Sequence, residues 1–487
     1  MKNSKSFIQK IVDMKVILAL QTVASILLLF FIVKLNILPT MYTGIVIGIF
    51  IVLLGIMFAL IKTRKQKSKR SVIGKGASVI LSIFMLVACL RVVQGDNLLS
   101  TITGAKTQTQ SMSVIVMKDS SVKELSDLKG KAFGINGKTD LEYTSTAIEN
   151  IEKEIDKINA INYDDFKALS EDLYNNKIDA IIVNEAYRGI LEENHENFTS
   201  ETRVIYTVEI EEEMENITKN VDVTEKPFNI YISGIDTYGP VSTRSRTDVN
   251  ILVTVNPKTR QVLMTSIPRD AYVTLASFGK KDKLTHSGIY GINETVNTVA
   301  NWLDTDINYY ARVNFSSLTE IVDALGGITV NSPIAFTAFD GTQFTTGNNQ
   351  LNGKEALSFV RERKSLGSGD FDRGKNQMRA LTGIINKMLS PAIITNYSSV
   401  LDSISGSFQT SMESSDITSL IKMQLNDMSG WTITQQQITG KGQTGGLPSY
   451  AMPGYQLYMM VPDATSVANV ESNIDKVING KKPVVIQ

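Results

Sequence analysis

The chain has 487 residues, long enough for two or three domains, and its 49 basic and 49 acidic side chains give a formal net charge of zero. That balance argues against a protein held on nucleic acid by bulk charge, and a hydrophobic content of 43% excludes a disordered or collagen-like chain. The single cysteine excludes an intramolecular disulfide, and two histidines argue against His-rich zinc sites and Ser-His-Asp chemistry.

Three apolar stretches open the chain. Residues 16–35 carry only Lys34, and residues 41–61 carry no charge. The third stretch, residues 71–93, has a shorter apolar centre, with cationic side chains at its margins that can extend to the membrane surface. A helix needs about 20 residues to cross the hydrocarbon layer, so we predict three transmembrane helices. The alternative for the third stretch is a buried soluble helix.

The charges are unevenly distributed along the chain. Residues 1–75 hold twelve Lys/Arg and one acid, which leaves 37 basic and 48 acidic residues in the rest. By the positive-inside rule, the N-terminus and the basic loop at residues 62–75 are cytoplasmic, and everything after residue 93 lies outside the cell membrane. The basic loop is expected to meet anionic membrane lipid. Cys89 lies in the third stretch, so the outer body has no cysteine, as is typical of a Gram-positive envelope protein.

Strand-like and helix-like segments alternate after the membrane region, which predicts the α/β class. We divide the chain into residues 1–95 (cytoplasmic N-terminus and three transmembrane helices), 96–106 (polar linker), 107–215 (a small α/β accessory domain) and 216–487 (a larger α/β domain). In the accessory domain we expect strands at 114–117, 132–135 and 179–183, and helices at 142–158, 166–174 and 185–192. In the larger domain we expect strands at 230–232, 249–255, 261–267, 310–313 and 459–461, and helices at 291–303, 315–325, 354–363, 376–388, 416–428 and 467–477. The charged run at 209–226 is interpreted as the boundary between the two domains.

Charged side chains concentrate at element ends in the larger domain, where open α/β sheets bind their ligands. They are Asp236; Arg244, Arg246 and Asp248; Arg269 and Asp270; Arg361, Glu362 and Arg363; and Asp370, Asp372, Arg373 and Gln377. Guanidinium groups recognise phosphate through paired hydrogen bonds, and a carboxylate pair such as Asp236 and Asp248 can hold a hard divalent cation. Arginines beside a carboxylate-bound metal are suited to a phosphoryl or pyrophosphate group. The alternative is a set of surface ion pairs, each worth little.

Seven ordered motifs of the larger domain resemble the LytR-CpsA-Psr family. They are NIYISGID (229–236), RTD (246–248), SIPRD (266–270), KLTH (283–286), VDALGGI (322–328), LNGKEALSFVRERK (351–364) and GDFDRGKNQ (369–377). The resemblance is close over residues 228–390, and the three preceding spans with an intervening domain resemble the capsule-associated CpsA branch. The accessory segments SVKELSDLKGKAFGI and KIDAIIVNEA resemble, more weakly, one lobe of a bacterial solute-binding protein.

The resemblance implies a membrane-anchored extracytoplasmic phosphotransferase. Such an enzyme takes a glycopolymer, here capsular polysaccharide, from an undecaprenyl-pyrophosphate carrier and joins it to peptidoglycan. It also implies an α/β/α domain with a mixed sheet and an apolar lipid tunnel, for which the faces of the helices at 291–303 and 315–325 are candidates. Capsule-assembly proteins are the expected partners of the accessory domain.

The resemblance also assigns roles by position. Asp236 and Asp248 match ligands of Mg²⁺, with Mn²⁺ as the alternative ion. The pyrophosphate-binding set is Arg244, Arg246, Arg269, Arg361, Arg363, Arg373 and Gln377, within which Arg244 stands two residues outside the motif. Arg246, Arg269 and Arg373 are the catalytic arginines, and Asp370 is the candidate base that activates the acceptor hydroxyl. His286 matches a family histidine, for which a structural role is favoured. Asn376 stands where family members often have a second arginine, so Lys375 is the candidate to supply that contact.

Two other functions stay open on the sequence. One is a membrane regulator whose basic cytoplasmic loop binds promoter DNA, although so short a loop holds no DNA-binding fold and DNA is the less favoured partner. The other is a non-catalytic sensor or scaffold that binds the lipid-linked polymer and controls its chain length.

Overall fold

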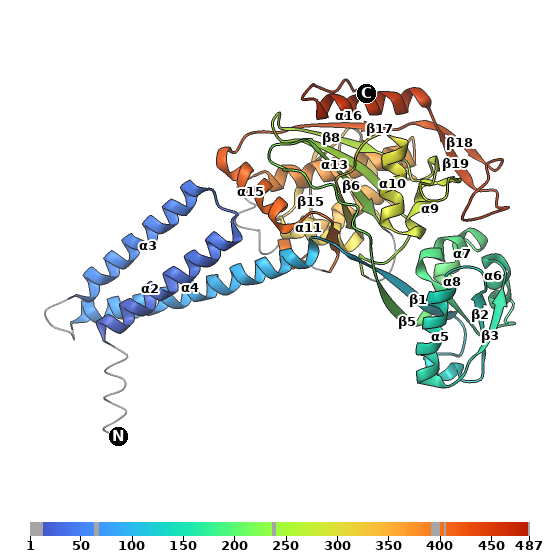
Figure 1. The fold of residues 1–487 in the computed structure, drawn as a ribbon, viewed down its shortest axis with the longest axis horizontal. Coiled ribbons are helices and arrows are strands. Elements are labelled where there is room, and N and C mark those ends of the chain that lie inside the picture. The colour runs from blue at the N-terminus through green and yellow to red at the C-terminus, as the bar shows by residue number, and fades with distance from the viewer. Residues whose placement is uncertain (1–12, 63–67, 236–239, 391–399, 404–405, 486–487) are drawn as a thin grey trace.

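Three apolar helices form a rod that projects from the body of the molecule (Figure 1). The computed structural model describes residues 13–62, 68–235, 240–390, 400–403 and 406–485. Within those residues, α2 (Met14–Leu35), α3 (Thr40–Ile61) and α4 (Lys69–Ile102) are the helices long and apolar enough to cross a membrane. The predicted linker at 96–106 is mostly helix, because α4 continues to Ile102. Leu99 and Ile102 are buried against the larger domain, and these contacts extend the helix beyond the membrane region.

Small side chains bring α2 and α4 into contact. Ala24 and Cys89 are buried in the cluster that joins the two helices. Ser78 Oγ donates a hydrogen bond of 2.6 Å to Gln21 Oε1, and both residues are fully buried. Small residues allow close approach in a membrane, and an interhelical hydrogen bond satisfies polar groups that lipid cannot.

The accessory domain is a mixed sheet covered on both faces by helices. The strand order is β3-β2-β4-β1-β5. Its strands are β1 (Thr107–Met117), β2 (Ala132–Asn136), β3 (Asn159–Tyr163), β4 (Ala180–Asn184) and β5 (Thr202–Glu213), and its helices are η1 (Leu125–Leu128), α5 (Leu141–Ile155), α6 (Phe166–Tyr174), η2 (Glu185–Tyr187), α7 (Arg188–Asn194) and α8 (Phe198–Glu201). The apolar residues of α5 pack on one face, while those of α6 and α7 pack on the other.

Two long strands, β1 and β5, connect the domains (Figure 1). β5 pairs antiparallel with β1 along its whole length at the edge of the sheet, from Thr107↔Glu213 to Met117↔Thr202. The prediction of a boundary from residue 209 was therefore wrong for the acidic end of β5. Glu209, Glu211 and Glu213 are tolerated there because they alternate along the strand and their side chains are exposed to solvent.

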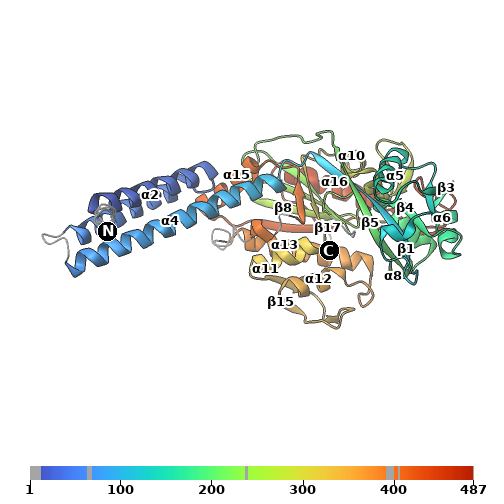
Figure 2. The ribbon, with the colours of Figure 1, turned by 90° about the horizontal axis from the view of Figure 1, so that it is seen from below.

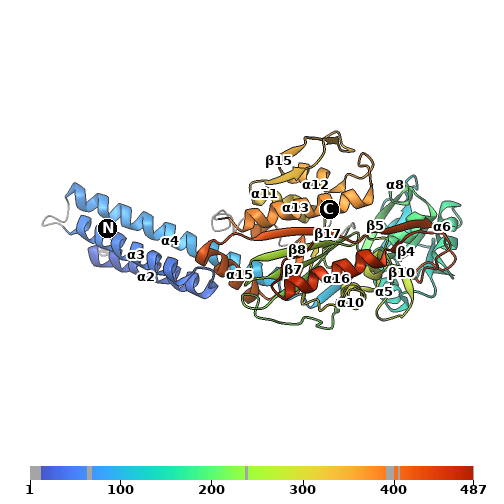
Figure 3. The same ribbon diagram turned by 90° about the horizontal axis from the view of Figure 1, so that it is seen from above.

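The larger domain is built on a six-stranded mixed sheet of order β16-β11-β6-β7-β8-β17. Its strands are β6 (Phe228–Gly234), β7 (Val249–Asn256), β8 (Gln261–Ser266), β11 (Tyr309–Val313), β16 (Phe408–Thr410) and β17 (Thr432–Gln437). α10 (Ile292–Trp302) and α16 (Ala464–Ile478) pack on one face. α11 (Phe315–Ala324), α12 (Gly353–Arg361), α13 (Asp370–Met388) and α15 (Ser414–Asp427) lie on the other side, and Figures 2 and 3 show α11, α12 and α13 there. The predicted α/β/α arrangement is confirmed.

Short hairpins and turns complete the larger domain. They are β9 (Tyr272–Thr274), β10 (Lys281–Lys283), α9 (Leu284–Ser287), η3 (Gly288–Tyr290), β12 (Ile328–Ser332), β13 (Phe336–Thr337), β14 (Gln343–Phe344), β15 (Gly347–Leu351), β18 (Gly440–Thr444) and β19 (Tyr458–Pro462). The segment between β18 and β19 reaches the accessory domain, where Met452 and Leu457, with Met459 of β19, join the same buried cluster as Ile190 of α7. The two domains therefore share a hydrophobic core.

Candidate functional site

Charged side chains meet at one edge of the large sheet. Asp248 directly precedes β7, and Arg269 follows the antiparallel neighbour β8, so both lie at the same edge. The first turn of α13 comes close to this edge, because an ideal Cβ on Gly374 would lie 2.5 Å from Ser266 Oγ at the end of β8. That turn carries Asp370 and Arg373. The order of the elements thus gathers residues from three separate motifs.

An ion-pair network joins these residues. Arg269 Nη1 lies 2.9 Å from Asp248 Oδ1, and Arg269 Nε lies 3.7 Å from Asp270 Oδ2. Arg373 pairs with Asp370 one helical turn apart. Within the described part of the chain, the buried Arg269 Nε has no hydrogen-bond partner. A buried guanidinium N–H without an acceptor is costly, so this donor is available to a ligand oxygen.

The arginines act together on Asp248. Burial by itself raises the pKa of Asp248, but the charges of Arg246, Arg269 and Arg373 outweigh it and hold the pKa below its ordinary value. Burial is the largest influence on the pKa of Arg373 and lowers it. Asp370 and Asp248 raise this pKa and Arg269 and Arg363 lower it, so the two carboxylates do not fully compensate for the loss of hydration. A bound anion beside Arg373 would add to that compensation.

Helix α13 adds a favourable dipole. Its 19 residues begin at Asp370, so its unpaired N–H groups and the positive end of its dipole lie beside the arginines. Helix N-termini are suited to phosphate for this reason. Arginine charge and helix dipole thus favour the same kind of ligand at one place.

An apolar cavity of about 320 Å³ begins beside this network. Asp248 and Gln377 are among its few polar lining residues, whereas Leu99 and Ile102 of α4 line it as well. The rest of the lining comes from β6, β7, β11, β16, α11, α12, α13 and α15, with Ile235, Asn314, Val400 and Leu401. The cavity therefore joins the charged network to the end of the third membrane helix.

The cavity corrects half of the predicted tunnel lining. α11 contributes Phe315, Leu318 and Ile321, as predicted. α10, the helix predicted at 291–303, lies on the opposite face of the sheet, where Val296 and Val299 are core residues. Sequence could not separate the two helices, because both have one apolar face and differ only in the side of the sheet they cover.

Three predicted arginines form none of the described ion pairs of the network. Arg244 is buried and donates from Nε, at 3.0 Å, and from Nη2 to the carbonyl oxygen of Ile289, so it holds the loop that carries Arg246. The Arg361 guanidinium lies over the ring of Phe315, 4.4 Å from its centroid, and so stands beside the cavity. Arg363 is exposed, but its charge reaches Arg373.

Arg246 contacts the accessory domain. Its Nη2 lies 3.4 Å from Glu192 Oε2 on α7. An ideal Cβ on Gly189 of the same helix would lie 2.0 Å from Arg246 Cζ, so only glycine leaves room for the guanidinium. Glu193 pairs with Lys283 at 3.7 Å. α7 therefore places two carboxylates against the cationic side of the site.

Three residues at the site were not assigned a role from sequence. Lys283 is buried and lies 3.4 Å from Asp270 Oδ1. Thr285 Oγ1 donates to Asp248 Oδ1 at 3.3 Å. Both lie in the KLTH motif, which was the available signal. Tyr458 of β19 is near enough for Asp270 and Asp370 to raise its pKa, after burial as the larger cause. It comes from a distant segment, and no motif or local pattern pointed to it.

The remaining predicted positions have structural partners. His286 Nδ1 lies 2.8 Å from Asp282 Oδ1, and both side chains are buried. The same carboxylate oxygen accepts from Ser449 Oγ at 2.8 Å, so this cluster anchors the segment before β19. Asn376 is buried and accepts from Arg379 Nη1 at 2.7 Å, while Lys375 pairs with Asp372 at 3.4 Å.

Only one of the two predicted metal ligands can be placed. Asp236 lies outside the described residues. Among the residues that are described, no group of three His, Cys, Asp or Glu side chains could hold a metal. Asp248 already accepts from Arg269 and Thr285 through Oδ1. A single carboxylate is compatible with Mg²⁺, which takes most of its other ligands from water and phosphate.

The structure thus combines three helices long and apolar enough to cross a membrane with an α/β domain in which a network of arginines and aspartates lies at one end of an apolar cavity. The LytR-CpsA-Psr family model matches residues 192–466, more than half of the chain, and the protein belongs to this family. A second model, described as NMT1/THI5 like, matches residues 86–225, which include the accessory domain.

Named relatives are similar to part of the chain. The polyisoprenyl-teichoic acid–peptidoglycan teichoic acid transferase TagU of Bacillus licheniformis is 40% identical over 211 residues, which are 42% of this chain and 68% of that protein. TagU of Bacillus subtilis is 41% identical over 196 residues, 40% of this chain and 63% of that protein. The crystal structure of B. subtilis TagV is 30% identical, covers 52% of this chain and 98% of its own, and has a TM-score of 0.44.

Proposed function

We propose that the protein is a phosphotransferase that moves a glycopolymer from a polyprenyl-pyrophosphate carrier to peptidoglycan outside the cell membrane. The observation that carries the proposal is the cavity that connects the arginine network to the end of α4. A polyprenyl chain needs an apolar channel, and its pyrophosphate needs cationic donors at one end of that channel. The cavity and network supply both.

The chemistry follows from the two ends of the carrier. The acceptor hydroxyl of peptidoglycan attacks the phosphorus next to the polymer, the bond to the bridging oxygen breaks, and polyprenyl monophosphate leaves. Arg269 and Arg373 offset the charge on the transferring and leaving phosphates. Asp370, which pairs with Arg373, is the candidate to take the hydroxyl proton. The product retains the polymer's first phosphate as a phosphodiester.

Mg²⁺ is proposed as the cofactor, with Asp248 and Asp236 as its protein ligands. Bound there, it would offset charge on the pyrophosphate oxygens. The proposal is supported by the position of Asp248 between the arginines and the cavity.

The polymer is proposed to be capsular polysaccharide. The support is the three-helix anchor and the accessory domain, which the sequence relates to the capsule-associated branch. The relatives TagU carry teichoic acid in their names, so wall teichoic acid is the alternative polymer. We place the N-terminus in the cytoplasm and both α/β domains outside, on the distribution of Lys and Arg.

The test is ligation by the full-length protein in lipid nanodiscs, with a polyprenyl-pyrophosphate-linked polymer, Mg²⁺ and peptidoglycan. Arg269→Ala is expected to reduce transfer at least a hundredfold, because one donor aimed at developing charge is worth about that factor. The control is Arg260→Ala, which removes an arginine that pairs with Asp427 elsewhere in the domain. Full transfer by Arg269→Ala would exclude the assignment.

A further inference from the structure

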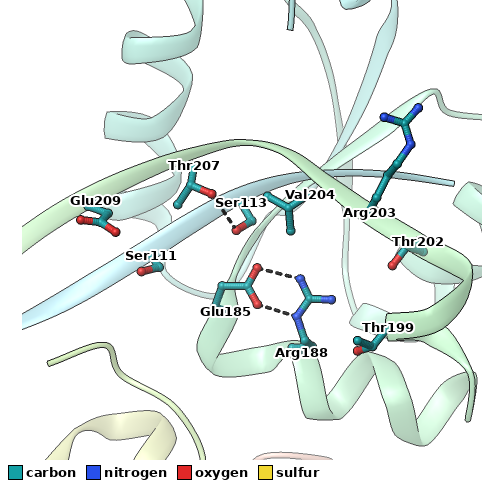
Figure 4. Close-up of a pocket in the computed structure, with 10 residues that line it drawn as sticks. All are labelled: Ser111, Ser113, Glu185, Arg188, Thr199, Thr202, Arg203, Val204, Thr207 and Glu209. Carbon is teal, nitrogen blue, oxygen red and sulfur yellow. Dashed lines mark hydrogen bonds and ion pairs between the residues drawn. The ribbon is translucent and has the colours of Figure 1, made fainter. Parts of the chain in front are cut away.

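A second pocket lies in the accessory domain, outside the site described above. It has a volume of about 410 Å³ and is lined by Ser111, Ser113, Glu185, Arg188, Thr199, Thr202, Arg203, Val204, Thr207 and Glu209 (Figure 4). That volume is in the range of small-ligand sites. All but one of the lining residues are polar, in contrast to the apolar cavity of the larger domain.

Polar side chains line a part of the sheet face where apolar core residues would be expected. Ile115 of β1 is fully buried on the face that packs against α6 and α7. Ser113 and Ser111 continue the same face, and both are buried. Their partners across the strand pair are Thr207 and Glu209. A sheet face under helices that turns from isoleucine to serine is better suited to a polar ligand than to apolar packing.

An ion pair lines the floor of the pocket. Arg188 Nη2 lies 2.8 Å from Glu185 Oε1, with a second contact from Nε to the other carboxylate oxygen, and the Glu185 side chain is 4% exposed (Figure 4). Arg203 also lines the pocket, but its Nη2 donates to the carbonyl oxygens of Ser120 and Val122, and its guanidinium points away from the ion pair (Figure 4). The charges of Arg188 and Glu185 neutralise each other, so the lining presents mainly the hydroxyl groups of serine and threonine to a ligand. That combination matches a neutral polyhydroxyl ligand.

A single carboxylate, that of Glu192, connects the pocket to the arginine network. Thr199 Oγ1 donates to Glu192 Oε1 at 2.6 Å, and Glu192 Oε2 is the partner of Arg246. On the other side, Ser111 Oγ lies 3.5 Å from Thr243 Oγ1, in the loop that leads to Arg246. A saccharide attached to a pyrophosphate at the arginines would therefore extend toward this pocket.

We propose that the accessory-domain pocket is a saccharide subsite that binds neutral sugar residues of the polymer while its pyrophosphate lies at the arginine network. This inference rests on the proposed function for the identity of the ligand. It assigns the accessory domain a role in choosing the polymer, and it favours a polysaccharide over a chain of repeated phosphates.

The test is calorimetric binding to the full-length protein in nanodiscs. The first probe is a neutral oligosaccharide, prepared from the surface polysaccharide of the strain that encodes the protein and freed of lipid and phosphate. Thr207→Val and Ser113→Ala each remove one hydroxyl with little change in shape. Each is expected to weaken binding about fivefold, the value of one hydrogen bond. The control is Ser145→Ala, an exposed residue of α5 on the opposite face of the sheet.

The second probe is polyprenyl pyrophosphate without sugar, which separates this inference from the proposed function. The subsite is overturned if the protein binds polyprenyl pyrophosphate but not the neutral oligosaccharide, or if both variants bind the oligosaccharide as tightly as the wild type does. If the oligosaccharide binds and both variants show the expected losses, the subsite is supported. Failure of polyprenyl pyrophosphate to bind would overturn the proposed function and leave that support for the subsite in place. A third probe, glycerol phosphate, overturns the inference if it binds the pocket and the neutral sugar does not.

Discussion

At the scale of single residues, the site depends on balanced charge. Among the described residues, the larger domain supplies four arginines and Lys283 against three aspartates, and α7 adds two glutamates. Asp248 is central because it pairs with Arg269 and also lines the cavity. Removing one partner of such a buried pair leaves an uncompensated charge.

Asp248→Asn is predicted to lower the free energy of unfolding by about 3 kcal/mol at pH 7. The pKa of Asp248 is lowered in the folded protein, so its stabilisation is complete above the ordinary aspartate pKa of about 3.9 and is lost as pH falls through the lower folded value. The difference in Tm between wild type and variant should therefore shrink below about pH 4. Fluorescence of Trp302 and Trp431, both in the larger domain, reports the unfolding. A difference that grows as the pH falls would contradict the pairing.

Part of this site could be predicted from the sequence. The motifs identified Asp248, Arg246, Arg269, Arg373 and Asp370, which the fold brings together. The motifs did not distinguish Arg244 from the arginines of the ion-pair network. Its contact with the Ile289 carbonyl depends on the path of a loop, which no local pattern encodes. Glu192 was missed for a similar reason: it lies in another domain and reaches the site only through tertiary packing.

At the scale of elements, α11 and α13 form one wall of the cavity and the sheet forms the other. The spacing of apolar residues predicted correctly whether most segments are helices or strands, and α6 has its predicted bounds. The helix expected to start at residue 376 starts at Asp370, because the charged first turn of α13 has no apolar period of its own. β17, with the polar sequence TITQQQ, was missed because parallel pairing with β8 overrides its weak local preference.

Leu318→Trp is predicted to block the carrier lipid. Leu318 lines the cavity from α11, so the larger ring would occupy space that the polyprenyl chain needs. Polyprenyl pyrophosphate that remains with the purified protein, measured by mass spectrometry of extracted lipid, should fall at least tenfold. The control is Val467→Trp on α16, which packs on the opposite face of the sheet. Equal lipid in the two variants would argue against the cavity as the lipid site.

Glu192→Gln is predicted to strengthen binding of pyrophosphate. The change removes a carboxylate that competes for Arg246, while the amide can still accept from Thr199. The gain should be about two- to fivefold, as expected for a partly exposed ion pair, and should diminish at high salt. Glu196→Gln, an exposed position two residues beyond α7, is the matched control. Weaker binding by Glu192→Gln would mean that the glutamate positions Arg246 and does not compete for it.

At the scale of the whole molecule, the membrane helices and the outer domains form one assembly. α4 enters the larger domain, where Leu99 and Ile102 line the cavity and Gly104 N donates to the Met412 carbonyl at 2.8 Å. The cavity therefore lies next to the end of α4. Composition predicted the anchor and the acidic outer body, but a separate linker was expected in place of this continuous helix.

The orientation in the membrane can be checked by labelling introduced cysteines. The single native cysteine, Cys89, is buried between membrane helices, so it should contribute little background labelling. Ser145→Cys in the accessory domain should react with a membrane-impermeant maleimide in cells whose wall has been removed. Lys69→Cys at the start of α4 should react only after the membrane is permeabilised. The reverse pattern would contradict the positive-inside assignment.

The identity of the leaving group distinguishes transfer of a phosphorylated glycopolymer from transfer of the glycan alone. Mass spectrometry of a complete ligation reaction measures both products. We expect polyprenyl monophosphate in an amount equal to that of peptidoglycan carrying the polymer through a phosphodiester. Release of polyprenyl pyrophosphate, with the polymer joined through a glycosidic bond and no phosphate, would contradict it.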